Sequence, residues 1–339
     1  MPFSTISVYA PEFSDTHWQK TVQLLKTLNE KYGSPVTTDD WTILKEQAIS
    51  YRTVNPGFFH LVTMKDDQVV GWLNGGVREV PDGGTVAFCR FDTLFEETPP
   101  EYSRVTAGEL ARTIEKQNCH TLYFMATNRR TMNLADSWHA TRYCRLDRYR
   151  LLRKDANYDL INSWLEEYPR RFPSFRLLHL DTIPDDLLDD YLELWRQFIN
   201  DMPREGEEII PFTLTREEWR RREEWRRKST QRWYLIALID ENGRMIGHSN
   251  GGISADNPEE MYQAMTGIER AHRGQGLSKW LKAALFTKVG EDFPANERLV
   301  TDMRAVNKPI HAVNAQMGYE LVGEGSEYVL TLDMLKAVR

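Results

Sequence analysis

The sequence predicts an α/β (α+β) protein built from two tandem copies of one unit, each a mixed, mostly antiparallel sheet flanked by helices. Chain length, an internal repeat and the order of strands and helices in each half predict this architecture. At 339 residues the chain is too long for one ordinary domain and about right for two. Hydrophobic residues make up 41% and charged residues 27%, so each domain can bury a core.

Residues 69–77 and residues 245–253 carry the internal repeat. They read V-V-G-W-L-N-G-G-V and M-I-G-H-S-N-G-G-I, and share G-x-x-N-G-G at an offset of 176 residues, which is 245 minus 69. Each follows an apolar stretch and a polar turn, the pattern of two strands joined as a hairpin. A strand, a polar helix and a last strand also recur late in each half, with Tyr143 and Tyr319 at the same offset. Both halves therefore contain one common unit.

We place the first domain at residues 1–170 and the second at residues 171–339. The junction reads E-E-Y-P-R-R-F-P-S, where Pro169 and Pro173 are expected to interrupt helix. Each unit is expected to run strand, one or two helices, three antiparallel strands, helix, strand, helix, strand.

In the second unit the opening strand is predicted at residues 175–180. Apolar residues at helical spacing predict a helix over 187–199. Residues 215–218, T-R-E-E, form a capping box that starts a second helix. That helix contains glutamates and arginines four residues apart, the spacing of ion pairs along a solvent-facing helix surface. We therefore interpret it as a solvated helix with Trp219 or Trp225 packing inward, and not as a nucleic-acid surface.

Charge and cysteine content narrow the class of protein. The net charge of −7 and the pI near 5.7 argue against a general nucleic-acid binder. Three cysteines are too few for a disulfide framework, which favours a reducing cytoplasm. No signal-like start and no apolar run of membrane-spanning length is found, so no membrane association is expected. The histidines are scattered without metal-ligand spacing, so no metal site is predicted.

Residues 266–278 read T-G-I-E-R-A-H-R-G-Q-G-L-S and lead into a predicted helix over 277–289. Glycine allows positive φ and close backbone approach, and a helix start presents unpaired N–H groups at the positive end of its dipole. The stretch therefore predicts an anion site. A Walker loop needs G-K-[S/T] after its second glycine, and a dinucleotide fingerprint needs a third glycine where Lys279 stands. A plain glycine turn before a helix is the alternative.

Within this stretch, R-G-Q-G-L-S at residues 273–278 resembles the signature Q/R-x-x-G-x-G/A of the GCN5-related N-acetyltransferase (GNAT) superfamily, with a serine at its end. The later N-x-x-x-x-x-x-N-x-x-x-G-Y segment at residues 307–319 looks like the final helix and last strand of that family. Order and spacing agree over roughly residues 175–335, and the tandem form is similar to mycothiol synthase-like proteins. In the first half the resemblance is to topology only.

The resemblance implies an acetyl-CoA-dependent N-acyltransferase that works by direct transfer in a ternary complex, with an active second domain. Backbone N–H groups from Gly274 to Ser278 would bind the pyrophosphate of coenzyme A, and Arg273 would add charge. The strand 261–268 would pair with pantetheine amides, and one of its last N–H groups would polarise the thioester carbonyl. The implied cofactor-binding residues are Thr266, Ile268, Arg273, Gly274, Gln275, Gly276, Leu277, Ser278, Asn307 and Asn314.

Acyl transfer needs an amine without its extra proton, a stabilised oxyanion and a proton for the thiolate. Glu269, at the end of the strand, is the candidate catalytic base, acting directly or through water. A structural ion pair with Arg270 or Arg273 is an equally good interpretation.

The proton donor and the role of one asparagine are open. The family often has a tyrosine acid where this chain has Asn314, so the thiolate would be protonated by water, His311 or Tyr319. Asn307 resembles a cofactor-contacting asparagine, and the alternative is a helix N-cap with Pro309 in the first turn.

The acceptor is less defined than the cofactor. Residues 200–208, N-D-M-P-R-E-G-E-E, lie between the first two helices, where the family shapes its acceptor pocket. Their acidity favours a small cationic amine, and a solvated loop is the alternative. The competing function is a non-catalytic acyl-CoA sensor or interaction protein that lost the acid. The amine, the acyl chain and the oligomeric state are not specified by the sequence.

The first domain is expected to lack the cofactor site. At the corresponding position it reads F-E-E-T-P-P-E, residues 95–101, in which the arginine-glycine loop is absent. Two prolines remove N–H donors there, and three glutamates bring negative charge to the place of a pyrophosphate.

Overall fold

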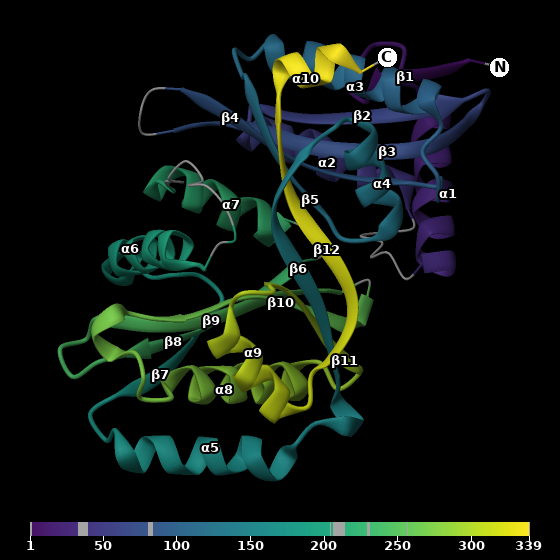
Figure 1. Ribbon diagram of the computed structural model, residues 1–339. Coiled ribbons are helices and arrows are strands. Elements are labelled where there is room, and N and C mark those ends of the chain that lie inside the picture. Colours follow the sequence, from purple (N-terminus) through teal and green to yellow (C-terminus); the bar gives the residue numbers. More distant parts are fainter. Residues whose placement is uncertain are drawn as a thin grey trace. The chain divides into compact units, whose positions relative to one another are not determined.

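The computed structural model describes residues 2–32, 40–80, 84–203, 205, 214–228, 231–255 and 257–338 (Figure 1). Its chain forms two compact units. Unit 1 contains the described parts of Met1–Leu146 together with Gly323–Arg339, and unit 2 contains those of Asp147–Pro203 and Pro211–Val322. This division differs from the expected boundary at residue 170, because each unit includes a segment from the other half of the sequence.

Unit 1 is an α/β layer structure. Its elements in chain order are β1 (Phe3–Ser7), α1 (Asp15–Tyr32), α2 (Trp41–Val54), β2 (Phe58–Lys65), β3 (Gln68–Glu79), β4 (Thr85–Thr93), α3 (Pro100–Glu115), β5 (Thr121–Ala126), α4 (Arg129–Ser137), the start of β6 (Thr141–Leu152), most of β12 (Glu320–Thr331) and α10 (Leu332–Ala337). The strand order is β1-β2-β3-β4-β5-β12, with β4 and β5 parallel and the other pairs antiparallel.

Side chains along β2 point alternately to the two faces of the sheet, and unit 1 has a hydrophobic core on each face. Phe59 and Leu61 pack in the cluster that contains α3 and α4, whereas Val62 and Met64 pack with α1 and α2. Since successive side chains of a strand point to opposite faces, the two helix pairs cover opposite sides of the sheet.

Unit 2 repeats this plan. Its elements are the end of β6, a 3-10 turn (Arg153–Asp155), α5 (Tyr158–Arg171), β7 (Arg176–Leu180), α6 (Asp185–Asp201), α7 (Arg216–Lys228), β8 (Gln231–Ile239), β9 (Met245–Ser254), β10 (Asn257–Ile268), a 3-10 turn (Arg270–His272), α8 (Leu277–Asp292), β11 (Arg298–Arg304) and α9 (Lys308–Met317). The strand order is β6-β11-β10-β9-β8-β7. Tyr234 and Ile236 of β8 face α5 and α8, and Leu235 and Ala237 face α6 and α7.

The predicted architecture and element order are confirmed, with two differences. The last strand of the chain does not stay in its own half, because Ser326–Thr331 of β12 pairs antiparallel with Thr121–Ala126 of β5 in unit 1. Helix α5 was not expected and continues through Pro169. Proline removes one backbone donor, and only two further residues follow before α5 ends at Arg171, so the helix loses little by including it.

The shared N-G-G motif has one structural cause in both units. A Cβ at Gly75 would collide with Phe88 and Cys89 of the neighbouring strand, and a Cβ at Gly251 would collide with Met261 and Tyr262. Both glycines allow the neighbouring strand to approach closely, β4 in unit 1 and β10 in unit 2, so sheet geometry alone explains this repeat.

The second helix of unit 2 begins as predicted. The Thr215 hydroxyl accepts from Glu218 N at 3.2 Å, and the Glu218 carboxylate accepts from Thr215 N at 3.0 Å. Trp219 is the tryptophan that packs inward, at 3% exposure. None of the described helices combines the length and apolarity needed to cross a membrane.

Candidate cofactor-binding and active site

Two glycines shape the loop between β10 and α8. Gly274 has φ 79° and Gly276 has φ 81°, which is left-handed backbone that residues with a Cβ adopt only with strain. A Cβ built at Gly274 meets no atom within 4 Å, so this part of the loop is open to a ligand. A Cβ at Gly276 would collide with the Tyr168 hydroxyl of α5. Glycine is therefore needed at position 276 for space as well as for conformation.

The start of α8 offers free backbone donors. Gly276 is the N-cap residue, no side chain caps the helix, and the first turn contains no acidic residue. Lys279 N bonds to Gly276 O at 2.8 Å, while Leu277 and Ser278 stand at positions whose N–H groups have no intrahelical acceptor. Buried Trp280 anchors the helix in the core of unit 2. This fixed positive helix end suits a phosphate group.

Arg273 holds the loop in place. Its Nε donates to Ile268 O at 2.9 Å, and its Nη2 donates to the Asp201 carboxylate of α6 at 2.7 Å. Arg270 pairs with the same carboxylate, and these two arginines, Arg270 first, hold the pKa of Asp201 at about 2. Two arginines share one carboxylate, so one positive charge remains beside the loop and would support an anion bound by its backbone N–H groups.

Strand β10 has an unpaired edge beside this loop. It pairs with β11 only over Glu260–Tyr262, although its pairing with β9 continues to Ile268. The register shifts between Gln263 and Thr266, so a bulge stands where pairing with β11 has ended. Glu269 N donates to Ile246 O of β9 at 2.8 Å.

Alternation along β10 decides which backbone groups face that edge. Because Glu269 N points to β9, the N–H groups of Ile268 and Thr266 point to the opposite, unpaired edge. An extended chain of amides can bond to such an edge as an added strand. The expected pantetheine strand therefore has the N–H groups of Thr266 and Ile268 available at this edge, while Ile268 O accepts from Arg273.

A buried polar network, which was not expected from the sequence, supports the bulge from the α8 side. Lys282 Nζ and Tyr319 Oη both donate to Gln263 Oε1, at 2.5 and 2.8 Å. Gln263 Nε2 donates to Ser249 Oγ at 3.3 Å, and that oxygen bonds to Thr266 Oγ1 at 2.8 Å. Lys282 is 2% exposed, and burial lowers its pKa to about 7.

One signal in the sequence could have found this network. Lys282, Phe286 and Val289 are spaced i, i+4 and i+7, which places the lysine on an apolar helix face. A lysine at such a position needs a buried acceptor, since an unpartnered ammonium group is costly to bury.

Glu269 has both carboxylate oxygens in contact with neighbouring side chains. Oε1 accepts from Arg244 Nη2 at 3.1 Å, and Oε2 lies 3.1 Å from His272 Nδ1. The ion-pair interpretation expected Arg270 or Arg273 as partner, but both of those arginines bind Asp201. These contacts favour a structural ion pair, with a different arginine from the one expected.

The asparagines of α9 have separate environments. Asn307 is the N-cap residue, as the alternative interpretation predicted, but its side chain makes no capping bond. Asn314 is fully buried, and its Nδ2 donates to Met303 Sδ at 3.0 Å, while its Oδ1 has no hydrogen-bond partner among the described residues.

The two candidate proton donors are both engaged. His311 bonds through Nδ1 to the Tyr149 hydroxyl and through Nε2 to Arg304 O, each at 3.0 Å. Tyr319 donates to Gln263, and burial raises the pKa of its phenol.

The acidic segment 200–208 lies partly outside the described residues, namely at Arg204 and at residues 206–208. Asp201 is neutralised by two arginines, and Glu205 accepts from Arg145 N at 3.0 Å. The negative charge of these two carboxylates is therefore less available to a cationic amine than the acidity of the sequence indicated. Within the described ranges, no three His, Cys, Asp or Glu side chains gather in a way that could hold a metal ion.

No protein-family model and no curated protein matches the chain in sequence. Several solved structures match its fold. A tandem GNAT protein from the clavulanic acid biosynthesis pathway, solved without AcCoA, is 17% identical with a TM-score of 0.73, over 97% of this chain and 98% of that one. A GCN5-related N-acetyltransferase from Sphaerobacter thermophilus is 10% identical with a TM-score of 0.60, over 97% and 96%.

A third match is a GCN5-related glucosamine N-acetyltransferase region of a fungal multi-domain GH3 β-N-acetylglucosaminidase. It is 11% identical with a TM-score of 0.59, over 97% of this chain and 38% of that one. The chain therefore has the GNAT fold in tandem form, as its sequence predicted.

Proposed function

We propose that the chain is an acetyl-CoA-dependent N-acyltransferase that acts on a small amine by direct transfer in a ternary complex, with its active site in unit 2. The open loop from Gly274 to Ser278, directly after the unpaired edge of β10, carries this proposal. The likeness of fold to solved acetyltransferases supports the same class.

The donor groups of unit 2 fit coenzyme A. The N–H groups of the loop would hold its pyrophosphate, and the unpaired edge of β10 beyond Tyr262 would bond to its pantetheine amides. Acetyl-CoA supplies the acyl group as an activated thioester. The N–H group of Thr266 or Ile268 would donate to the oxyanion that forms when the amine attacks.

Two proton transfers remain to be assigned. The ion pair of Glu269 with Arg244 argues that a water molecule, or a second group on the amine, takes the proton from the nucleophile. Asn314 cannot act as an acid, and His311 and Tyr319 are engaged in other bonds. Water is therefore our proposed proton donor to the thiolate.

One observation supports a second candidate, a non-catalytic acyl-CoA sensor. A buried asparagine occupies position 314, where the family often has a tyrosine acid, so cofactor binding without turnover is chemically consistent with this site.

Thiol release separates the two candidates. The protein would be incubated with acetyl-CoA and, in turn, spermidine, glucosamine, an aminoglycoside and a peptide with a free N-terminus. Amine-dependent formation of free thiol above the rate without amine is the expected result. Cofactor binding without thiol release over this panel would favour the sensor, and no binding of acetyl-CoA would contradict both functions.

A further inference from the structure

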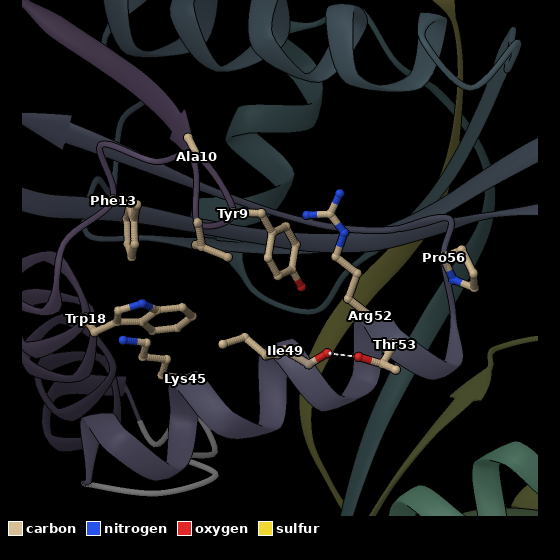
Figure 2. A pocket seen from close by; sticks show the side chains of 10 residues that line it. Tyr9, Ala10, Phe13, Trp18, Lys45, Ile49, Arg52, Thr53 and Pro56 are labelled. Carbon is tan, nitrogen blue, oxygen red and sulfur yellow. Dashed lines mark hydrogen bonds between the residues drawn. The ribbon is translucent and has the colours of Figure 1, made fainter.

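Unit 1 contains a hollow that the proposed transfer reaction does not use. It lies between the end of β1 and the helices α1 and α2, and its volume is about 660 Å³ (Figure 2). Pockets for small molecules generally measure about 300–1,000 Å³, so this one is large enough for a metabolite.

The floor of the hollow is apolar. Val8, Phe13 and Trp18 are buried there, and the rings of Phe13 and Trp18 meet edge to face at 5.2 Å. Ile49 of α2 extends into the same space and is 49% exposed, one of few large apolar side chains of the described residues with that much exposure (Figure 2). An apolar ligand would cover this side chain and gain the free energy of burial.

The rim of the hollow presents a guanidinium group. Arg52 of α2 lies over the ring of Tyr9, 4.1 Å from its centroid, and the Tyr9 hydroxyl donates to Ala48 O at 3.1 Å. A guanidinium group that lies over a ring still has N–H groups to donate to an oxygen acceptor. Within the described ranges Arg52 has no carboxylate partner, whereas Lys45 on the same rim is paired with Asp15 at 2.6 Å. One positive charge is left over, which matches a single anionic group.

The corresponding pair of helices in unit 2 carries paired arginines. Between α6 and α7, Arg216 pairs with Asp189 and Arg220 pairs with Asp185, each at 2.5 Å. Trp219 fills the space below these pairs, with its ring 4.6 Å from that of Tyr191. Among the described residues, these two arginines of α7 are thus paired with carboxylates of α6, whereas Arg52 of α2 has no such partner.

We propose that the hollow of unit 1 binds a small organic monoacid, with its carboxylate on Arg52 and its apolar body against Ile49 and Trp18. A carboxylate matches the planar fork of a guanidinium group in two parallel hydrogen bonds. The site is separate from the coenzyme A loop of unit 2, and the proposal does not depend on catalysis.

Calorimetric titration tests the proposal with phenylacetate, indole-3-acetate and hexanoate as probes. The uncharged phenylacetamide tests the need for charge, and inorganic phosphate tests the need for an apolar body. We expect saturable binding of the carboxylates, and binding of phenylacetamide and phosphate at least tenfold weaker. Absence of carboxylate binding at millimolar concentrations, or equal binding of phenylacetamide or phosphate, would overturn the proposal.

Variants locate the site. Arg52→Gln should weaken carboxylate binding about tenfold or more, the usual effect of losing a charge-assisted hydrogen bond. Arg112→Gln, on α3 of the same unit and paired with Glu109, is the matched control and should bind as the wild type does. Should Arg52→Gln fail to fold, Arg52→Lys keeps the charge but loses the fork, and should still bind several-fold more weakly. Unchanged binding in the folded Arg52 variant would refute the site.

Discussion

Glu269 shows how a candidate catalytic residue can have a structural role. Its carboxylate binds Arg244 and His272, which join the turn before β9 to the segment after β10. We expect Glu269→Gln and Arg244→Gln to lower kcat to a similar, small extent. Steady-state kinetics at neutral pH with the best amine of the panel measure both. A loss of about 10²–10⁴ in Glu269→Gln alone, shrinking at high pH, would instead identify Glu269 as the general base.

Lys282 gives a pH-dependent prediction. Burial lowers its pKa to about 7 in the folded protein, against about 10.4 in an unfolded chain. Between these values the unfolded chain binds a proton that the native state does not, so this group makes the free energy of unfolding rise with pH. As the pH falls below 7, the lysine of the folded protein is protonated as well. Below that pH, Lys282 no longer makes the free energy of unfolding depend on pH.

The variant Lys282→Met isolates this effect. It keeps the bond from Tyr319 to Gln263, so the acceptor stays satisfied. The wild-type minus variant difference in free energy of unfolding should rise with pH between 7 and 9, by up to about 1.4 kcal/mol per pH unit. Lys288→Met on the same helix is the control, since Asp292 raises the pKa of Lys288 and both states stay protonated in that window. A flat difference in urea titrations of Lys282→Met would show that Lys282 stays charged when folded.

At the scale of elements, the loop between β10 and α8 was the most predictable part of the site. Two glycines before an apolar helix indicated a helix start that holds an anion, and the structure has positive φ at both. The role of Arg273 could not be predicted, because its partner Asp201 lies 72 residues away in sequence. The bulge in β10 was equally hidden, since it arises from pairing with β9 and contacts with α8 and not from local sequence.

Substitution of Gly274 tests this loop. Gly274→Asp places a negative charge where the pyrophosphate would lie, so it should abolish the rise in melting temperature that coenzyme A gives the wild type. Gly243→Asp is the matched control, because Gly243 has φ 81° and equally open surroundings in the turn before β9. Both variants should lose similar stability. An unchanged coenzyme A shift in Gly274→Asp would show that the cofactor binds elsewhere.

Gly276 is less suited to this experiment. Any side chain there would collide with Tyr168 of α5, so lost binding in a Gly276 variant could result from a displaced helix and not from charge.

At the scale of the whole molecule, the repeat predicted two copies of one fold but not which strand completes which unit. Residues 326–331 pair with β5 of unit 1, and Asp147 and the residues after it in β6 belong to unit 2. The final strands of the two halves are similar in length and pattern, so local propensity does not choose between them. Specific contacts do: Tyr328, which is 4% exposed, stacks on Phe124 of β5 at 5.2 Å. The unit that a strand joins is therefore decided by tertiary contacts, which the hydrophobic periodicity of the sequence does not predict.

The two units also differ in the backbone donors and charges that a phosphate would meet. In unit 1, α3 begins at Pro100 after the N-cap residue Pro99, and neither proline has an N–H group to donate. Glu101 adds a negative charge in that first turn. Strand β4 pairs with β3 without a register shift from Thr85 to Thr93, so it lacks the bulge found in β10. Donors, charge and strand geometry all disfavour a pyrophosphate here.

We therefore expect each chain to bind one coenzyme A, in unit 2. Calorimetric titration measures the stoichiometry directly, and the value should be near one. Gly274→Asp should remove the heat of binding entirely, because no second site would remain to produce it. A stoichiometry near two, or residual saturable heat in Gly274→Asp, would show that the proline-containing helix start of unit 1 binds the cofactor despite its missing donors. The organic acid proposed for unit 1 should leave this stoichiometry unchanged, since all the residues that line its hollow lie between Val8 and Pro56 and none belongs to the coenzyme A loop proposed for unit 2.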